Sequence, residues 1–123
     1  MAISTLLDAC ARAFAMVALA DGEISPAEEH RFARFVAGEP SLKSSSQTDV
    51  RAVWKQAVKD VKASPSFGGP LVVIRTEVFS PSDKAVVMRA GQAALVADNK
   101  LELQESAAIR TLAEALGLDP EKF

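Results

Sequence analysis

The sequence predicts an all-α fold: a compact bundle of about six to seven helices in two pseudo-symmetric halves, forming a single domain over residues 1–123. Three observations support this prediction. Alanine, the strongest helix former, supplies 22 of the 123 residues, and tyrosine is absent. Apolar residues recur at the three- and four-residue spacing of helices. A short acidic turn also occurs twice, within residues 18–32 and 95–109, at a constant offset of 77 residues.

Residues 5–20 are expected to form the first helix. Their apolar side chains recur at helical spacing, which predicts an amphipathic helix that packs on the core. Asp8 and Arg12 interrupt the apolar run, and no basic residue precedes Asp8. A membrane span and a secretion signal are both disfavoured, so a cytoplasmic protein is expected.

The second helix is expected over residues 26–38 and has the clearest start in the chain. Ser25 suits the N-cap, Pro26 the first helical position and Glu28 the third, from which its side chain can return to the cap. Gly38 suits the end of this helix, because glycine adopts the backbone conformations that terminate helices.

A third helix is expected to begin at Ser46 or Thr48 and to run to about Lys62. Its apolar stripe, which predicts the face toward the core, consists of Val50, Val53, Trp54, Ala57, Val58 and Val61. The basic stripe on its other face consists of Arg51, Lys55, Lys59 and Lys62. Such a stripe is typical of a solvated helix face, and it also suits an anionic lipid surface.

The remaining chain predicts a short helix and two longer ones. Residues 71–79 have strand propensity, but a lone strand would lack a partner, so a short helix opened by Pro70 is expected. Further helices are expected over residues 80–96 and 102–117. Residues 119–121 carry one more helix-start signal, with aspartate at the N-cap and proline after it.

Composition excludes several classes of function. The net charge of −2 disfavours a globally basic nucleic-acid binder. The single cysteine, Cys10, excludes an internal disulfide and a cysteine-based zinc site, and its apolar helix face predicts a buried structural thiol. The single histidine, His30, excludes a multi-histidine metal site. Any metal site must therefore consist of oxygen ligands, which suit Ca²⁺, Mn²⁺ or Mg²⁺.

Each copy of the acidic turn contains an aspartate after a helix, a turn residue, a buried aliphatic residue and a glutamate that opens the next helix. The matched pairs are Asp21 and Asp98, Gly22 and Asn99, Ile24 and Leu101, and Glu28 and Glu105. Two interpretations of the first copy are open. In one, Glu28 caps its helix and no metal is needed. In the other, side-chain oxygens at the first, third, fifth and eighth positions of the turn converge on one cation. Those positions hold Asp21, Glu23, Ser25 and Glu28.

The second copy carries a lysine, Lys100, at the position that Glu23 occupies in the first. If the two turns are adjacent, Lys100 can pair with Glu23 or Asp21, which would form a salt bridge without a metal. The second copy nevertheless retains three carboxylates. The candidate metal ligands are therefore Asp21, Glu23, Glu28, Asp98, Glu102 and Glu105.

Two segments carry a resemblance to a known family. Residues 20–28 (ADGEISPAE) and 113–120 (AEALGLDP) resemble the tellurite-resistance TerB family and the related N-terminal domain of membrane-anchored DnaJ-like proteins. The resemblance covers nearly the whole chain, and the second copy of the turn departs from it at Asn99 and Lys100. It implies an all-α fold with two pseudo-symmetric halves, no established catalysis, and a link to tellurite resistance or metal stress. It also implies a negative patch that is proposed to bind divalent cations. The patch residues are Asp21, Glu23 and Glu28 in the first copy and Asp98 and Glu105 in the second, and spacing adds Glu102.

The residues and the resemblance lead to two hypotheses of function. In the first, a non-catalytic domain binds a divalent cation at its acidic turns and acts as an adaptor for a protein partner, in a complex peripheral to the inner membrane. The alternative is a metal-free protein-interaction or membrane-surface module that uses the basic stripe. An enzyme is not expected, because His30 suits a surface position among charged neighbours. Neither nucleic acid nor a small-molecule substrate is expected.

Overall fold

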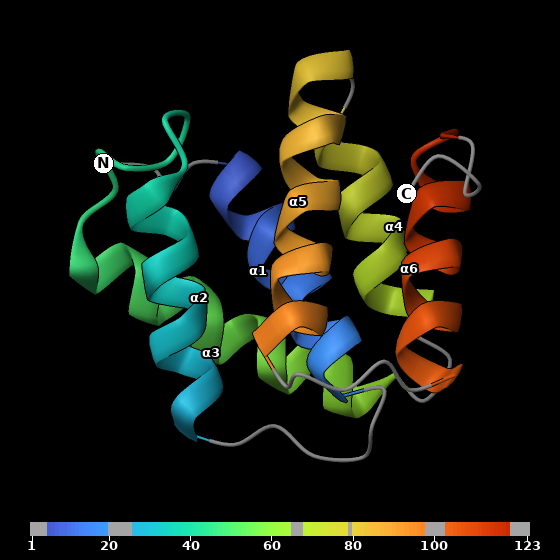
Figure 1. Cartoon of the computed structure of the whole chain (residues 1–123), viewed down its shortest axis with the longest axis horizontal. Coiled ribbons are helices and arrows are strands. Elements are labelled where there is room, and N and C mark those ends of the chain that lie inside the picture. Colours follow the sequence, from blue (N-terminus) through green and yellow to red (C-terminus); the bar gives the residue numbers. More distant parts are fainter. Residues whose placement is uncertain (1–4, 20–25, 65–67, 79, 98–102, 119–123) are drawn as a thin grey trace.

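The computed structural model describes residues 5–19, 26–64, 68–78, 80–97 and 103–118, with the backbone alone for residues 95–97 and 103–106 (Figure 1). This part of the chain contains six helices and no strand, so the all-α prediction is confirmed. The helices are α1 (Thr5–Leu19), α2 (Pro26–Gly38), α3 (Gln47–Ala63), α4 (Gly68–Glu77), α5 (Pro81–Ala97) and α6 (Leu103–Ala115). The helix-start signal at residues 119–121 lies outside the described residues.

Helix α1 is the central element of the bundle. It contacts all five other helices, and every residue from Ala9 to Ala18 is buried. The prediction of an amphipathic helix was therefore wrong, because α1 is enclosed on all sides. Its many alanines explain the difference, since small side chains let neighbouring helices approach from every direction. Every helix in the described ranges is too short or too polar to cross a membrane.

Local capping interactions set the helix ends close to where the sequence predicts them. Helix α2 begins at Pro26 and ends at Gly38. Ser46 caps α3 and Ser80 caps α5, because each hydroxyl accepts a hydrogen bond at 3.1 Å from the backbone N–H three residues later. Gly117 has a φ of 73° after α6, and the Leu118 N–H donates back to the Ala113 carbonyl at 2.8 Å.

The segment with strand propensity forms α4. This helix confirms the expected short helix, although it begins before Pro70 and ends at Glu77 rather than at residue 79. Pro70 is tolerated as its third residue, because backbone N–H groups in a first helical turn have no helical acceptor. Its side chain and that of Ile74 are buried in the bundle, whereas Val72 is exposed. Tertiary packing thus overrides the local β propensity.

Three aromatic rings form the centre of the core where α1, α2 and α3 meet. The ring centroid of Phe14 lies 5.6 Å from both Phe32 and Trp54 in edge-to-face contacts. The rings of Phe32 and Trp54 stack at 5.2 Å. Trp54 belongs to the predicted apolar stripe, whose other residues are buried except the half-buried Val58. The predicted core face of α3 is confirmed.

Helices α1 and α5 pack closely and in the same direction, so that their C-terminal ends, Leu19 and Ala97, lie at the same end of the bundle (Figure 1). Gly91 of α5 allows α6 to pack closely on α5. A Cβ atom at this position would lie only 2.9 Å from Leu112 Cδ2 of α6, whereas Val17 Cγ2 of α1 would be at an ordinary contact distance of 3.6 Å. Helix α2 also packs on α5, and α6 also packs on α1. The second helix of each pair, α1–α2 and α5–α6, thus packs on the first helix of the other pair as well as on its own.

Candidate functional site

Most of the predicted metal ligands lie outside the part of the chain that the structure describes. Asp21, Glu23, Asp98 and Glu102 belong to the undescribed segments between helices, and Lys100 does too. Glu105 lies in the first turns of α6, where only the backbone is described. The assignment of these residues to a cation site therefore stays a prediction.

Glu28 is the one candidate ligand whose side chain is described. It lies in the first turn of α2, as predicted, and only 3% of the residue is exposed. A carboxylate with so little solvent access requires nearby compensating groups, because burial without them is costly. This burial fits both a capping role and a partly enclosed cation site. Within the described ranges, no group of three or more histidine, cysteine, aspartate or glutamate side chains has an arrangement that could hold a metal ion.

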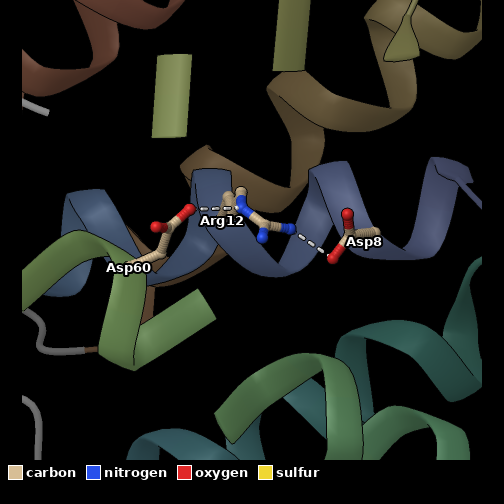
Figure 2. A network of polar contacts seen from close by, with 3 residues as sticks. All are labelled: Asp8, Arg12 and Asp60. Atoms are coloured by element: carbon tan, nitrogen blue, oxygen red, sulfur yellow. Dashed lines mark hydrogen bonds and ion pairs between the residues drawn. The ribbon is translucent and has the colours of Figure 1, made fainter. Parts of the chain in front are cut away.

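A polar network on the central helix was not predicted from the sequence. Arg12 is only 6% exposed, yet its Nε donates to Oδ2 of Asp60 on α3 at 3.0 Å. Its Nη1 also donates to the carboxylate of Asp8, one turn earlier on α1 (Figure 2). An ionised arginine is stable at this depth because both carboxylates compensate its charge. The one indication in the sequence was a single arginine within an apolar helix. Its partner on α3 could not be predicted, because the two residues are distant in sequence.

Glu77, at the end of α4, joins this network as a third acid. The pKa of its carboxyl is raised to about 7, mainly by burial and then by a hydrogen bond with Asp8 and by the charge of Asp8. The positive charge of Arg12 acts in the opposite direction. One carboxyl oxygen of Glu77 is buried without a hydrogen-bond partner in the described part of the chain. The carboxyl is therefore poised to change its charge near neutral pH.

A second long-range ion pair joins the end of α2 to α5. Arg89 donates to both carboxylate oxygens of Glu39, from Nε at 3.1 Å and from Nη2 at 2.8 Å. Cys10 lies close to this pair and is fully buried, as predicted for a structural thiol. Burial raises the pKa of the Cys10 thiol above its usual range, and the charges of Glu39 and Asp83 add to this effect. The thiol is thus unsuited to nucleophilic chemistry.

The basic stripe of α3 is a solvent-exposed surface. Its four residues are all exposed: Arg51, Lys55, Lys59 and Lys62. Asp60 lies on the same helix, and its carboxylate accepts from Arg12 of α1 (Figure 2). His30 is also exposed, on α2, as predicted.

The fold and these sites define a class of protein: a small all-α bundle built around a buried alanine-rich helix, with acidic segments that follow two parallel helices. A family model described as tellurite resistance protein TerB matches residues 7–123. The chain therefore belongs to the TerB family, whose members are in general non-catalytic. Comparisons with curated proteins and with solved structures gave no match.

Proposed function

We propose that this TerB domain is a non-catalytic module that binds a divalent cation at its acidic turns and presents the bound form to a protein partner. The observation that supports this proposal best is the parallel packing of α1 and α5. The C-terminal ends of α1 and α5, Leu19 and Ala97, lie at the same end of the bundle (Figure 1). An acidic turn follows each of these helix ends in the sequence.

The charge distribution at this end of the bundle favours a cation. The C-terminal ends of α1 and α5 carry the negative ends of two helix dipoles. An aspartate follows each helix end in the sequence, Asp21 two residues after Leu19 and Asp98 directly after Ala97. The negative charge of an aspartate is disfavoured beside the negative end of a helix dipole. A bound cation would offset this repulsion. Oxygen ligands of this kind suit Ca²⁺, Mn²⁺ or Mg²⁺.

Calorimetric titration of each of the three cations into the whole chain tests the proposal. Binding of one cation should release or absorb heat and raise the melting temperature, because a ligand that binds only the folded state stabilises it. Asp21→Asn should lose both effects while it folds normally. Glu114→Gln is the matched control, because Glu114 is an exposed acid on the described C-terminal part of α6. An absence of heat and of stabilisation at millimolar metal would refute the proposal.

The exposed basic stripe supports a second candidate function, a metal-free surface module that associates with anionic lipid. Four basic side chains on one helix can contribute about 1 kcal/mol each near an anionic membrane. Co-sedimentation with vesicles that contain phosphatidylglycerol tests this candidate at low and high salt. Binding at low salt that is lost in Lys55→Gln/Lys59→Gln would support it. The exposed, more distant Arg110→Gln provides the control. No binding at low salt would reject it.

A further inference from the structure

A pocket of about 470 Å³ lies where α2, the first turn of α3 and the connection between them meet. Its volume falls in the range of roughly 300–1,000 Å³ that is typical of small-molecule sites. Of the predicted metal ligands, Glu28 alone has a described side chain, and it does not line the pocket.

The floor and one wall of the pocket are apolar. Val36 of α2 and Val50 of α3 are 3% and 8% exposed and form the floor from the edge of the core. Ala33 and Ala37 form the α2 wall, and both are exposed. The buried valines and the exposed alanines together form an apolar hollow, which an apolar group of a ligand can fill.

The rim of the pocket is basic. Lys43 and Arg51 line it, and neither side chain has an ion-pair partner among the described residues. Arg12 and Arg89, by contrast, are each paired with a carboxylate. Among the described residues, Glu29 is the one acid that lines the pocket. The basic side chains that line the described part of the pocket therefore outnumber the acid, in a chain whose net charge is −2.

The first turn of α3 adds to the positive potential of the rim. Gln47 is the first residue of this 17-residue helix and lines the pocket together with Ser45. The N-terminal end of a helix carries a partial positive charge, which favours an anion beside it. His30 of α2 supplies a ring N–H that can donate to the same anion.

We propose that this pocket binds a small soluble amphipathic anion, in which one carboxylate or phosphate group is attached to a short apolar body. The charged group lies between Lys43 and Arg51, where a guanidinium can bind it through two parallel hydrogen bonds. The apolar body lies on Val36 and Val50. Both halves of the ligand are required, because the floor offers no hydrogen-bonding side chain and the rim offers little apolar surface.

The single tryptophan provides an internal reporter of binding. Trp54 lies one helical turn after Val50, and Phe32 lies one turn before Val36, so the stacked pair neighbours the floor residues on both helices. Tryptophan fluorescence and amide NMR spectra of the whole chain are recorded during titration with octanoate and octyl phosphate. Acetate and inorganic phosphate test the need for the apolar body. Octyltrimethylammonium and octanol test the need for the negative charge.

Four variants test the position of the ligand. Lys43→Gln and Arg51→Gln should each weaken binding of octanoate or octyl phosphate by roughly three- to tenfold. Ala37→Leu should abolish binding, because its side chain fills the pocket from an exposed position without disturbing the core. Lys59→Gln should bind as the wild type does, because Lys59 is basic and exposed on the same helix but does not line the pocket. Unchanged melting temperatures confirm that all four variants fold.

Two results would support the proposal: saturable spectral changes at the lining residues, and their loss in the pocket variants but not in Lys59→Gln. Absence of saturable changes with both amphipathic anions would overturn it. Equal binding of octyltrimethylammonium would overturn the assignment of negative charge. Equal weakening by Lys59→Gln and Arg51→Gln would also overturn it, because it would assign the effect to the basic stripe as a whole.

Discussion

The guanidinium of Arg12 on α1 donates to the carboxylate of Asp60 on α3 at 3.0 Å, across 48 positions of sequence. The contact connects the central helix to the helix that carries the basic stripe. Asp8 accepts from the same guanidinium, and Glu77 interacts electrostatically with both Asp8 and Arg12. Arg12 therefore compensates a group of acids drawn from three helices.

Replacement of Arg12 by methionine is expected to lower the free energy of unfolding by about 2–4 kcal/mol, because it leaves three acids without their cation. Arg12→Lys should recover only part of this loss, since an ammonium group cannot hold two carboxylates in a fixed planar geometry. Urea denaturation measures both effects. Arg110→Met removes an exposed arginine from α6 and should stay within about 0.5 kcal/mol of the wild type. Equal losses in the two methionine variants would contradict the role assigned to Arg12.

Stability is expected to fall as the pH rises from about 4.5 to about 7, because of Glu77. The pKa of its carboxyl is raised from 4.5 to about 7 in the folded protein, mainly by burial and then by Asp8. In this interval the folded state holds the proton more tightly than the unfolded state, so proton binding favours folding and is lost with rising pH. The expected contribution is about 1–2 kcal/mol, less than the full shift because the carboxyl is partly screened by solvent.

Glu77→Gln isolates this contribution. The amide keeps the shape of the carboxyl but does not titrate, so the variant should lack this component of the pH dependence. The free energy of unfolding of both proteins is measured by urea denaturation between pH 4 and pH 8. A difference between variant and wild type that stays constant over this range would show that Glu77 does not titrate there.

Gly91→Ala is expected to destabilise the bundle by about 1–2 kcal/mol, although alanine is the better helix former. Its Cβ would lie 2.9 Å from Leu112 Cδ2 and 3.2 Å from Ile109 Cδ1, and Leu112 is fully buried and has little room to move. Adding Leu112→Val should recover part of the loss, which a double-mutant cycle measures as a coupling energy. Gly38→Ala, which meets no atom within 4 Å, is the matched control and should be neutral or stabilising.

Cys10 is expected to resist thiol reagents in the native state. Its side chain is fully buried, and burial raises the pKa of the thiol above its usual range, so little thiolate is present and none is accessible. Modification by an aromatic disulfide reagent should proceed only as fast as the chain unfolds, and denaturant should accelerate it. Rapid labelling of the native protein would contradict the burial of Cys10.

Sequence patterns predicted the helices well, because the signals that form and end helices act over about four residues. Ser46 and Ser80 cap their own helices, and Gly117 ends α6. The apolar stripe of α3 identified Trp54 as a core residue for a similar local reason, since helical periodicity places these side chains on one face. The repeat also identified Glu28 as the residue that opens α2, where it is buried.

Other features of the molecule depend on contacts between distant segments. The periodicity of α1 predicted one buried face, but the helix is buried on all faces because five other helices surround it. The local propensity of residues 71–79 favoured a strand, but residues 71–77 belong to helix α4, in which Ile74 packs on the core. The pairing of Arg89 with Glu39 joins residues 50 positions apart and has no local signal.

The amino-acid sequence thus decides which residues are helical, where most helices begin and end, and that any metal site must consist of oxygen atoms. These properties follow from short-range capping, from periodicity and from the scarcity of cysteine and histidine. The tertiary structure determines which acids surround Arg12 and how far the pKa of Glu77 rises. It also places Lys43 and Arg51 beside an apolar pocket. Burial and electrostatic interaction depend on distance in space, and only the packed helices set those distances.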